Sequence, residues 1–182
     1  MTDSISNMNT QHLVLTAIGK DKTGLVSELT GLVSECRCNI LDSKMAIFGN
    51  EFTMIMLLAG DSASLSQLEM RLPPMAMQLN LLTMMKRTAT HNHTEKSQFM
   101  LQLEGPDQPG TIKTLTSYLA TNTVNVKSLK SATRTVEGQI WQFAEIIIDL
   151  NDATELTTFS QGFESVCGSL NMNCSFKPIT IE

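Results

Sequence analysis

The sequence is short of basic residues. It has 13 Lys and Arg against 18 Asp and Glu, which gives a formal net charge of −5. Nucleic-acid backbones are bound by clustered Lys and Arg, and the chain has only one small basic cluster, Lys86-Arg87, followed by His91 and His93. An acidic chain with so few clustered cations is a poor direct ligand for nucleic acid.

Long apolar runs are also missing. The longest, residues 54–59, is far shorter than the roughly 20 residues that cross a bilayer. The first residues are polar and acidic, without the apolar segment of a secretory signal. We therefore expect a cytoplasmic protein with no membrane contact, whose four cysteines are reduced thiols.

Recognisable catalytic and metal-binding motifs are absent. The chain has no phosphate-binding glycine loop, no dinucleotide fingerprint and no Ser or Cys nucleophile in a known motif. Cys36 and Cys38 form one close pair, but structural zinc sites use two such pairs. We expect neither an enzyme nor a bound metal or cofactor, although a catalytic site assembled from distant residues is an alternative.

An internal repeat is the strongest positive feature. Residues 19–24 and 105–110 share the pattern Gly-x-Asp-x-x-Gly at an offset of 86 residues. At the same offset, Cys38-Asn39-Ile40 matches Val124-Asn125-Val126 as an apolar-Asn-apolar triplet. A repeat of this length indicates duplicated structural modules.

The repeat divides the chain into four segments. Residues 1–10 are polar and predict a disordered tail. Residues 11–88 and 97–182 form the two domains, and residues 89–96, which contain no large apolar side chain, form the linker.

Each half shows the same order of elements. In the first half, strand patterns at residues 12–18, 39–48, 51–59 and 79–87 alternate with helical patterns at 25–36 and 65–72, and we expect Pro73-Pro74 to end the second helix. The second half repeats this order from residue 98. The predicted fold is α+β, with two tandem ferredoxin-like βαββαβ domains, each an antiparallel sheet with both helices on one face.

The central strand of the first half has no polar side. Residues 54–58, Met-Ile-Met-Leu-Leu, are apolar on both alternating faces. This pattern predicts that a sheet face or a strand edge packs against another module, for which a homo-oligomer is one solution.

The first strand-to-helix turn of each half is the predicted ligand site. Its glycines permit close backbone approach, and the helix that follows offers free N–H groups to a carboxylate. An aspartate could bind an ammonium group, and an asparagine at the next strand could bind both groups of an amino acid. The candidate residues are Asp21, Thr23, Gly24, Leu25, Asn39 and Ile40 in the first half, and Asp107, Gly110, Thr111, Asn125 and Val126 in the second.

These features resemble the ACT domain, a regulatory module that commonly binds amino acids. The resemblance rests on the βαββαβ order, on Asp-x-x-Gly before the first helix and on Asn at the second strand, and it covers residues 13–87 and 99–181. Four segments are also similar to the bacterial glycine cleavage system transcriptional repressors: LTAIG (15–19), CNILDS (38–43), GNEFTMIMLL (49–58) and MMKRT (84–88).

The resemblance implies a role and partners. It implies a repressor without a DNA-binding domain, which binds the activator protein of the glycine cleavage operon and responds to glycine or another small amino acid. The first half carries this resemblance better, because the four quoted segments all lie in it, and Pro106 and Pro109 stiffen the turn of the second half where the first half has Lys20 and Lys22. A regulatory subunit of an amino-acid biosynthetic enzyme is the alternative function.

Overall fold

The computed structural model describes residues 10–89, 97–150 and 155–179. It divides the chain into two compact units, Met1–Asn92 and His93–Glu182, and this division falls in the segment expected to be the linker. Apart from Thr10 and Ala89, the expected tail and linker lie outside the described residues. The two units are described separately below.

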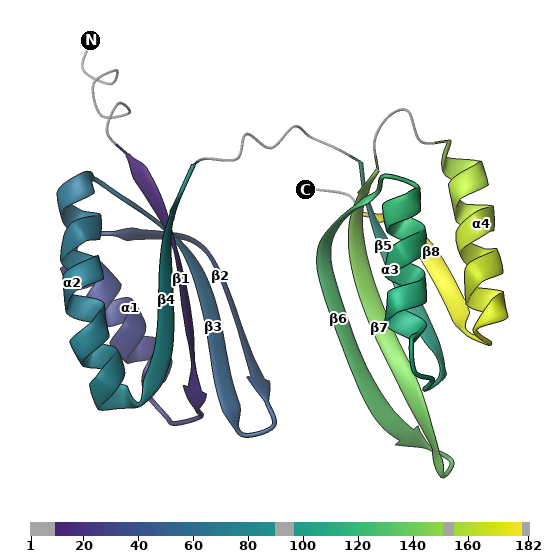
Figure 1. Ribbon diagram of the computed structural model, residues 1–182, viewed down its shortest axis with the longest axis horizontal. Coiled ribbons are helices and arrows are strands. Elements are labelled where there is room, and N and C mark those ends of the chain that lie inside the picture. The colour runs from purple at the N-terminus through teal and green to yellow at the C-terminus, as the bar shows by residue number, and fades with distance from the viewer. Residues whose placement is uncertain (1–9, 90–96, 151–154, 180–182) are drawn as a thin grey trace. The chain divides into compact units, whose positions relative to one another are not determined.

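The first unit has four strands and two helices in the order βαββαβ (Figure 1). The elements are β1 (Gln11–Lys20), α1 (Leu25–Glu35), β2 (Asn39–Phe48), β3 (Glu51–Gly60), α2 (Ser62–Leu79) and β4 (Leu81–Thr88). All three strand pairs are antiparallel, and the sheet order is β2-β3-β1-β4.

The second unit repeats this architecture. Its elements are β5 (Ser97–Pro106), α3 (Thr111–Thr121), β6 (Asn125–Val136), β7 (Gln139–Leu150), α4 (Leu156–Ser169) and β8 (Asn173–Ile179). The sheet order is β6-β7-β5-β8, again antiparallel throughout. In each unit both helices cover the same side of the sheet (Figure 1). The predicted tandem ferredoxin-like fold is confirmed.

Alternation along the strands builds each core. In β1, Leu13, Leu15 and Ala17 are fully buried under the helices, whereas the residues between them point to the other face. Because successive strand residues point to opposite faces, one face of each sheet is packed and the other, here called the open face, is left uncovered by the helices.

Helix α2 corrects one expectation. Pro73 and Pro74 lie inside it, and the helix continues to Leu79. Proline removes a helical N–H and usually ends or kinks a helix, at a cost of about 3 kcal/mol. Here the buried stripe runs through the prolines, with Leu72 before them and Ala76 after them both in the core. Burial of this stripe on both sides of the prolines offsets the lost backbone hydrogen bonds.

Candidate functional site

The β1–α1 turn of the first unit is held by backbone contacts. The Asp21 N–H donates to the Asn50 carbonyl oxygen at 2.9 Å, which ties the turn to the β2–β3 hairpin. Gly24 is the N-cap of α1, with φ 96°, and no side chain caps this helix end. The N–H groups of the first helical turn are thus available to an outside acceptor such as a carboxylate.

Backbone conformation and close packing explain why glycine occupies two positions of this motif. Gly24 adopts the left-handed backbone conformation that L side chains rarely adopt. A Cβ at Gly19 would lie 2.7 Å from the Asn80 carbonyl oxygen, so only glycine fits against the turn before β4. Within the described part of the chain, the Asp21 carboxylate makes no hydrogen bond or ion pair, so the fold does not explain it.

The second unit has the same backbone turn with different side chains. The Asp107 N–H donates to the Ile140 carbonyl oxygen at 2.9 Å, and Gly110 has φ 90°. Thr111 is 2% exposed, and its hydroxyl donates to the Gln108 carbonyl oxygen at 2.9 Å. The residue at the same register position of the first unit is Leu25, which has no hydroxyl.

The structure does not bring the turn and Asn39 together within one unit. Asn39 pairs with Ala59, which in turn pairs with His12 near the start of β1. Asp21 follows Lys20 at the other end of the same strand. Eight residues of extended chain separate these ends, a span of roughly 27 Å. A single small amino acid cannot contact both residues of one unit, and the ligand role of each residue by itself stays a prediction.

The same separation holds in the second unit. Asn125 pairs with Asp149, which pairs with Gln98 near the start of β5, while Asp107 follows the end of that strand at Pro106. In both units a residue with positive φ precedes the strand, and a β-bulge follows the asparagine. These features place the asparagine at the open face but far from the turn.

Three predicted residues have structural roles. Leu25 is 3% exposed and belongs to the core of the first unit, against which Ile40 also packs. Thr111 is buried, as described above. Any ligand contact from Leu25 would have to come from its backbone, whereas Ile40 is partly exposed and Val126 is exposed.

The ionisable side chains near Asn39 are paired or buried within the first unit. The Arg87 guanidinium donates to both carboxylate oxygens of Glu69, at 2.7 and 2.8 Å, and this hydrogen bonding lowers the pKa of Glu69. Arg87 is therefore engaged by Glu69 within the first unit, whereas Lys86 forms no ion pair with the residues that the structure describes. Burial raises the pKa of the Cys38 thiol, so this cysteine stays protonated and is a poor nucleophile.

Sequence reasoning missed Asp149. This residue is on the open face, opposite Asn125, yet only 6% exposed. Its Oδ1 has no hydrogen-bond partner among the described residues, and the Lys127 Nζ lies 3.8 Å away. In the first unit the position opposite Asn39 is Ala59. The sequence feature that could have pointed to Asp149 is an aspartate within the apolar run of β7.

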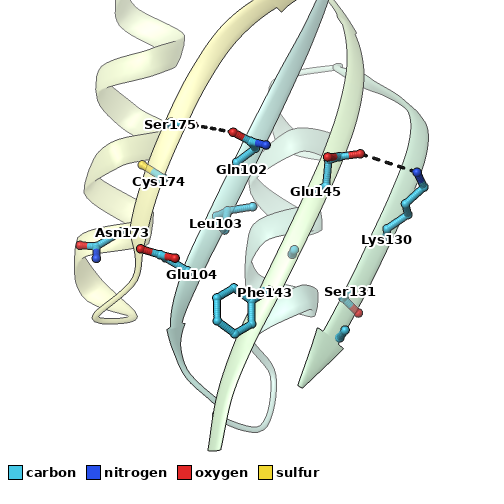
Figure 2. Close-up of a pocket in the computed structure, with 12 residues that line it drawn as sticks. Gln102, Leu103, Glu104, Lys130, Ser131, Phe143, Glu145, Asn173, Cys174 and Ser175 are labelled. Carbon is cyan, nitrogen blue, oxygen red and sulfur yellow. Dashed lines mark hydrogen bonds and ion pairs between the residues drawn. The ribbon is translucent and has the colours of Figure 1, made fainter. Parts of the chain in front are cut away.

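One hollow lies away from all the predicted site residues. It has a volume of about 640 Å³ and crosses the open face of the second sheet (Figure 2). Lys130 and Glu145 face each other there at 3.8 Å, and Gln102 lies 3.5 Å from the Ser175 hydroxyl. Phe143 forms part of the floor. Both polar and apolar side chains line the hollow.

No group of three His, Cys, Asp or Glu side chains in residues 10–89, 97–150 and 155–179 is arranged to hold a metal ion. Over the same residues, no helix combines the length and apolar character needed to cross a membrane.

Comparison with known proteins identifies the family. The model of the ACT domain matches residues 11–86. The chain is 32% identical to the glycine cleavage system transcriptional repressor of Escherichia coli over 176 residues, which covers 94% of this chain and 93% of that protein. The corresponding protein of Shigella flexneri matches equally.

Solved structures agree with this relationship. A crystal structure assigned as a glycine cleavage system transcriptional repressor is 32% identical, with a TM-score of 0.75, and the match covers 94% of this chain and 99% of that chain. A protein of unknown function from Galdieria sulphuraria has the same fold at 21% identity, with a TM-score of 0.77 and the same coverage. The chain belongs to the family of ACT-domain regulatory proteins that includes the glycine cleavage system transcriptional repressor of Escherichia coli.

Proposed function

We propose that this chain represses the glycine cleavage system in response to a small amino acid, by binding an activator protein rather than DNA. The observation that carries the proposal is the 32% identity to the Escherichia coli repressor over nearly the whole of both chains. The net charge of −5 supports contact with protein over contact with a phosphate backbone.

Glycine is the effector that the β1–α1 turn fits best. Its carboxylate can accept hydrogen bonds from the free N–H groups at the start of α1. Its ammonium group can pair with Asp21, which has no partner among the described residues. The turn is exposed, and a Cβ on Gly24 would meet nothing within 4 Å, so the approach is open. In the second unit the buried Thr111 and the flanking prolines leave a stiffer turn.

Binding of the activator tests the function. The purified chain should retain the activator protein of the glycine cleavage operon in a pull-down, and glycine should release it. Because linkage is reciprocal, the activator must weaken glycine binding by the same factor. No retention in either condition would contradict the proposal, and co-purification with the catalytic subunit of a biosynthetic enzyme would favour the alternative role as a regulatory subunit.

Titration with glycine tests the site. We expect Asp21→Ala to weaken glycine binding by about tenfold or more, because a hydrogen bond to a charged group contributes about 1.5–3 kcal/mol. Isothermal titration calorimetry measures this, with alanine and serine as comparison ligands. Asp42→Ala is the matched control, since Asp42 is another exposed aspartate, on β2.

The second turn provides the contrast. Asp107→Ala should leave the glycine affinity unchanged if the first turn is the binding site. Equal heats for the wild type and for Asp21→Ala would exclude the β1–α1 turn of the first unit.

A further inference from the structure

The open face of the first sheet carries an apolar patch. Four large side chains lie on it: Ile18 is 41% exposed, Ile55 44%, Leu82 76% and Met84 64%. Strand pairing places them close together, because Ile18 pairs with Leu82, and Thr16 links Ile55 to Met84 in the neighbouring row. Half-buried Val14 and Leu57 extend the patch along the same face.

The second unit provides an internal comparison. The register positions of the four large side chains are polar on its open face, whereas those of Val14 and Leu57 hold Met100 and Ile147, and the four polar residues line the hollow in Figure 2. Glu104 corresponds to Ile18, Glu145 to Ile55, Asn173 to Leu82 and Ser175 to Met84. The fold therefore does not require apolar side chains at these positions. An exposed apolar patch that the fold does not need is typical of a contact surface.

We propose that this face binds the same face of a second copy of the chain, as two sheets packed face to face. This inference concerns the assembly of the protein and does not rest on its proposed function. The commitment to a second copy comes from the charges around the patch, which are arranged so that two copies complement each other.

Two charges lie at opposite edges of one row of the sheet. Asp42 on β2 pairs with Leu57 on β3, which pairs with Val14 on β1, which pairs with Lys86 on β4. A two-fold axis parallel to the strands, between β1 and β3, exchanges the edges of the sheet while it keeps each row in place. It sets Asp42 of each copy against Lys86 of the other, which gives two equivalent ion pairs.

The same axis pairs a second set of charges. Lys20 on β1 and Glu51 on β3 are neighbours at the end of the sheet. Exchange of β1 with β3 sets Lys20 of one copy against Glu51 of the other. Within the patch it sets Leu57 against Val14 and Ile55 against Thr16, and it places Lys44 of one copy opposite Met84 of the other. One operator satisfies both sets of charges, which is the property expected of a self-complementary surface.

The face is at the lower end of the size range of dimer interfaces. Four strands about 4.8 Å apart, followed over roughly 27 Å of length, give about 500 Å² of flat area, and protruding side chains increase the accessible area. Stable complexes bury about 800 Å² per partner. Stacked sheets commonly pack about 10 Å apart through interdigitated side chains.

Removal of the patch tests the proposal. The full chain should sediment as a dimer at micromolar concentration, and Leu82→Asn combined with Met84→Ser should weaken dimerisation by at least about a hundredfold, since two buried apolar side chains are lost from each copy. The new residues are those that the second unit carries at these positions. Met70→Gln, which replaces a 72%-exposed methionine on α2, is the matched control and should leave the dimer unchanged.

Charge reversal tests the axis. Lys86→Glu should weaken the dimer by about tenfold, because each copy then sets like charges against each other at Asp42. Asp42→Lys combined with Lys86→Glu should restore it. A monomeric wild type, a dimer indifferent to the Leu82 and Met84 changes, or a double reversal that fails to restore association would each overturn the proposal.

Discussion

Gly19→Ala should destabilise the first unit by about 2–3 kcal/mol, because the new methyl group cannot fit. Its Cβ would lie 2.7 Å from the Asn80 carbonyl oxygen and 2.8 Å from Leu81 Cδ2. The first of these is a backbone atom in a turn where Asn80 has φ 54°, so it cannot move aside without disturbing the start of β4. Thermal and chemical denaturation measure the loss.

Two other glycines of the first unit separate the effect of this close contact from the effects of helix propensity and backbone strain. Gly31 lies within α1 and a Cβ there meets nothing within 4 Å, so Gly31→Ala should stabilise by about 0.5–1 kcal/mol through helix propensity. Gly24 also has open space but a φ of 96°, so alanine there costs about 1–2 kcal/mol through backbone strain alone. Hydrogen exchange of Gly19→Ala should increase mainly in peptides of residues 11–88. Equal stability of Gly19→Ala and Gly31→Ala would contradict the assigned contact.

Phe163→Ala should cost the second unit about 3–5 kcal/mol, because it empties the centre of its core. Phe163 is 1% exposed, and its ring lies 6.0 Å from that of Tyr118 and 6.3 Å from that of Phe159. Tyr118 also donates a hydrogen bond to the Phe159 carbonyl oxygen at 2.8 Å, so these residues join α3 to α4. Denaturation curves measure the change.

A control on the same helix isolates the effect of burial. Leu156 is 43% exposed at the start of α4, and Leu156→Ala should change stability by less than about 0.5 kcal/mol. If both variants unfolded alike, the cavity explanation for Phe163 would fail.

The fold was predictable because several local signals agree. The repeated turn, the alternating strands and the helical stripes all indicate the same βαββαβ order in each half, and the structure confirms it. Pro73-Pro74 misled the prediction, because the local cost of proline is visible in the sequence while the burial of Leu72 and Ala76 is tertiary.

The candidate site was less predictable. The distance between Asp21 and Asn39 could have been foreseen, since a helix that joins two parallel strands returns the chain to the starting end of the sheet. The burial of Asp149 could not, because it depends on the bulge at Lys127 and on neighbours from other strands. Residues 54–58 predicted an apolar strand without a polar side. The extent of the apolar open face could not be predicted, because it depends on the register of neighbouring strands.

The divergence of the two open faces has a consequence for stoichiometry. A duplicated gene segment first yields two identical surfaces, and a protein with two identical surfaces can polymerise through both. The first half has Leu82 and Met84 where the second half has Asn173 and Ser175, so each chain keeps one apolar surface that can bind a second copy. Growth through these faces therefore stops at two copies, and the polar face of the other half stays open to a different contact.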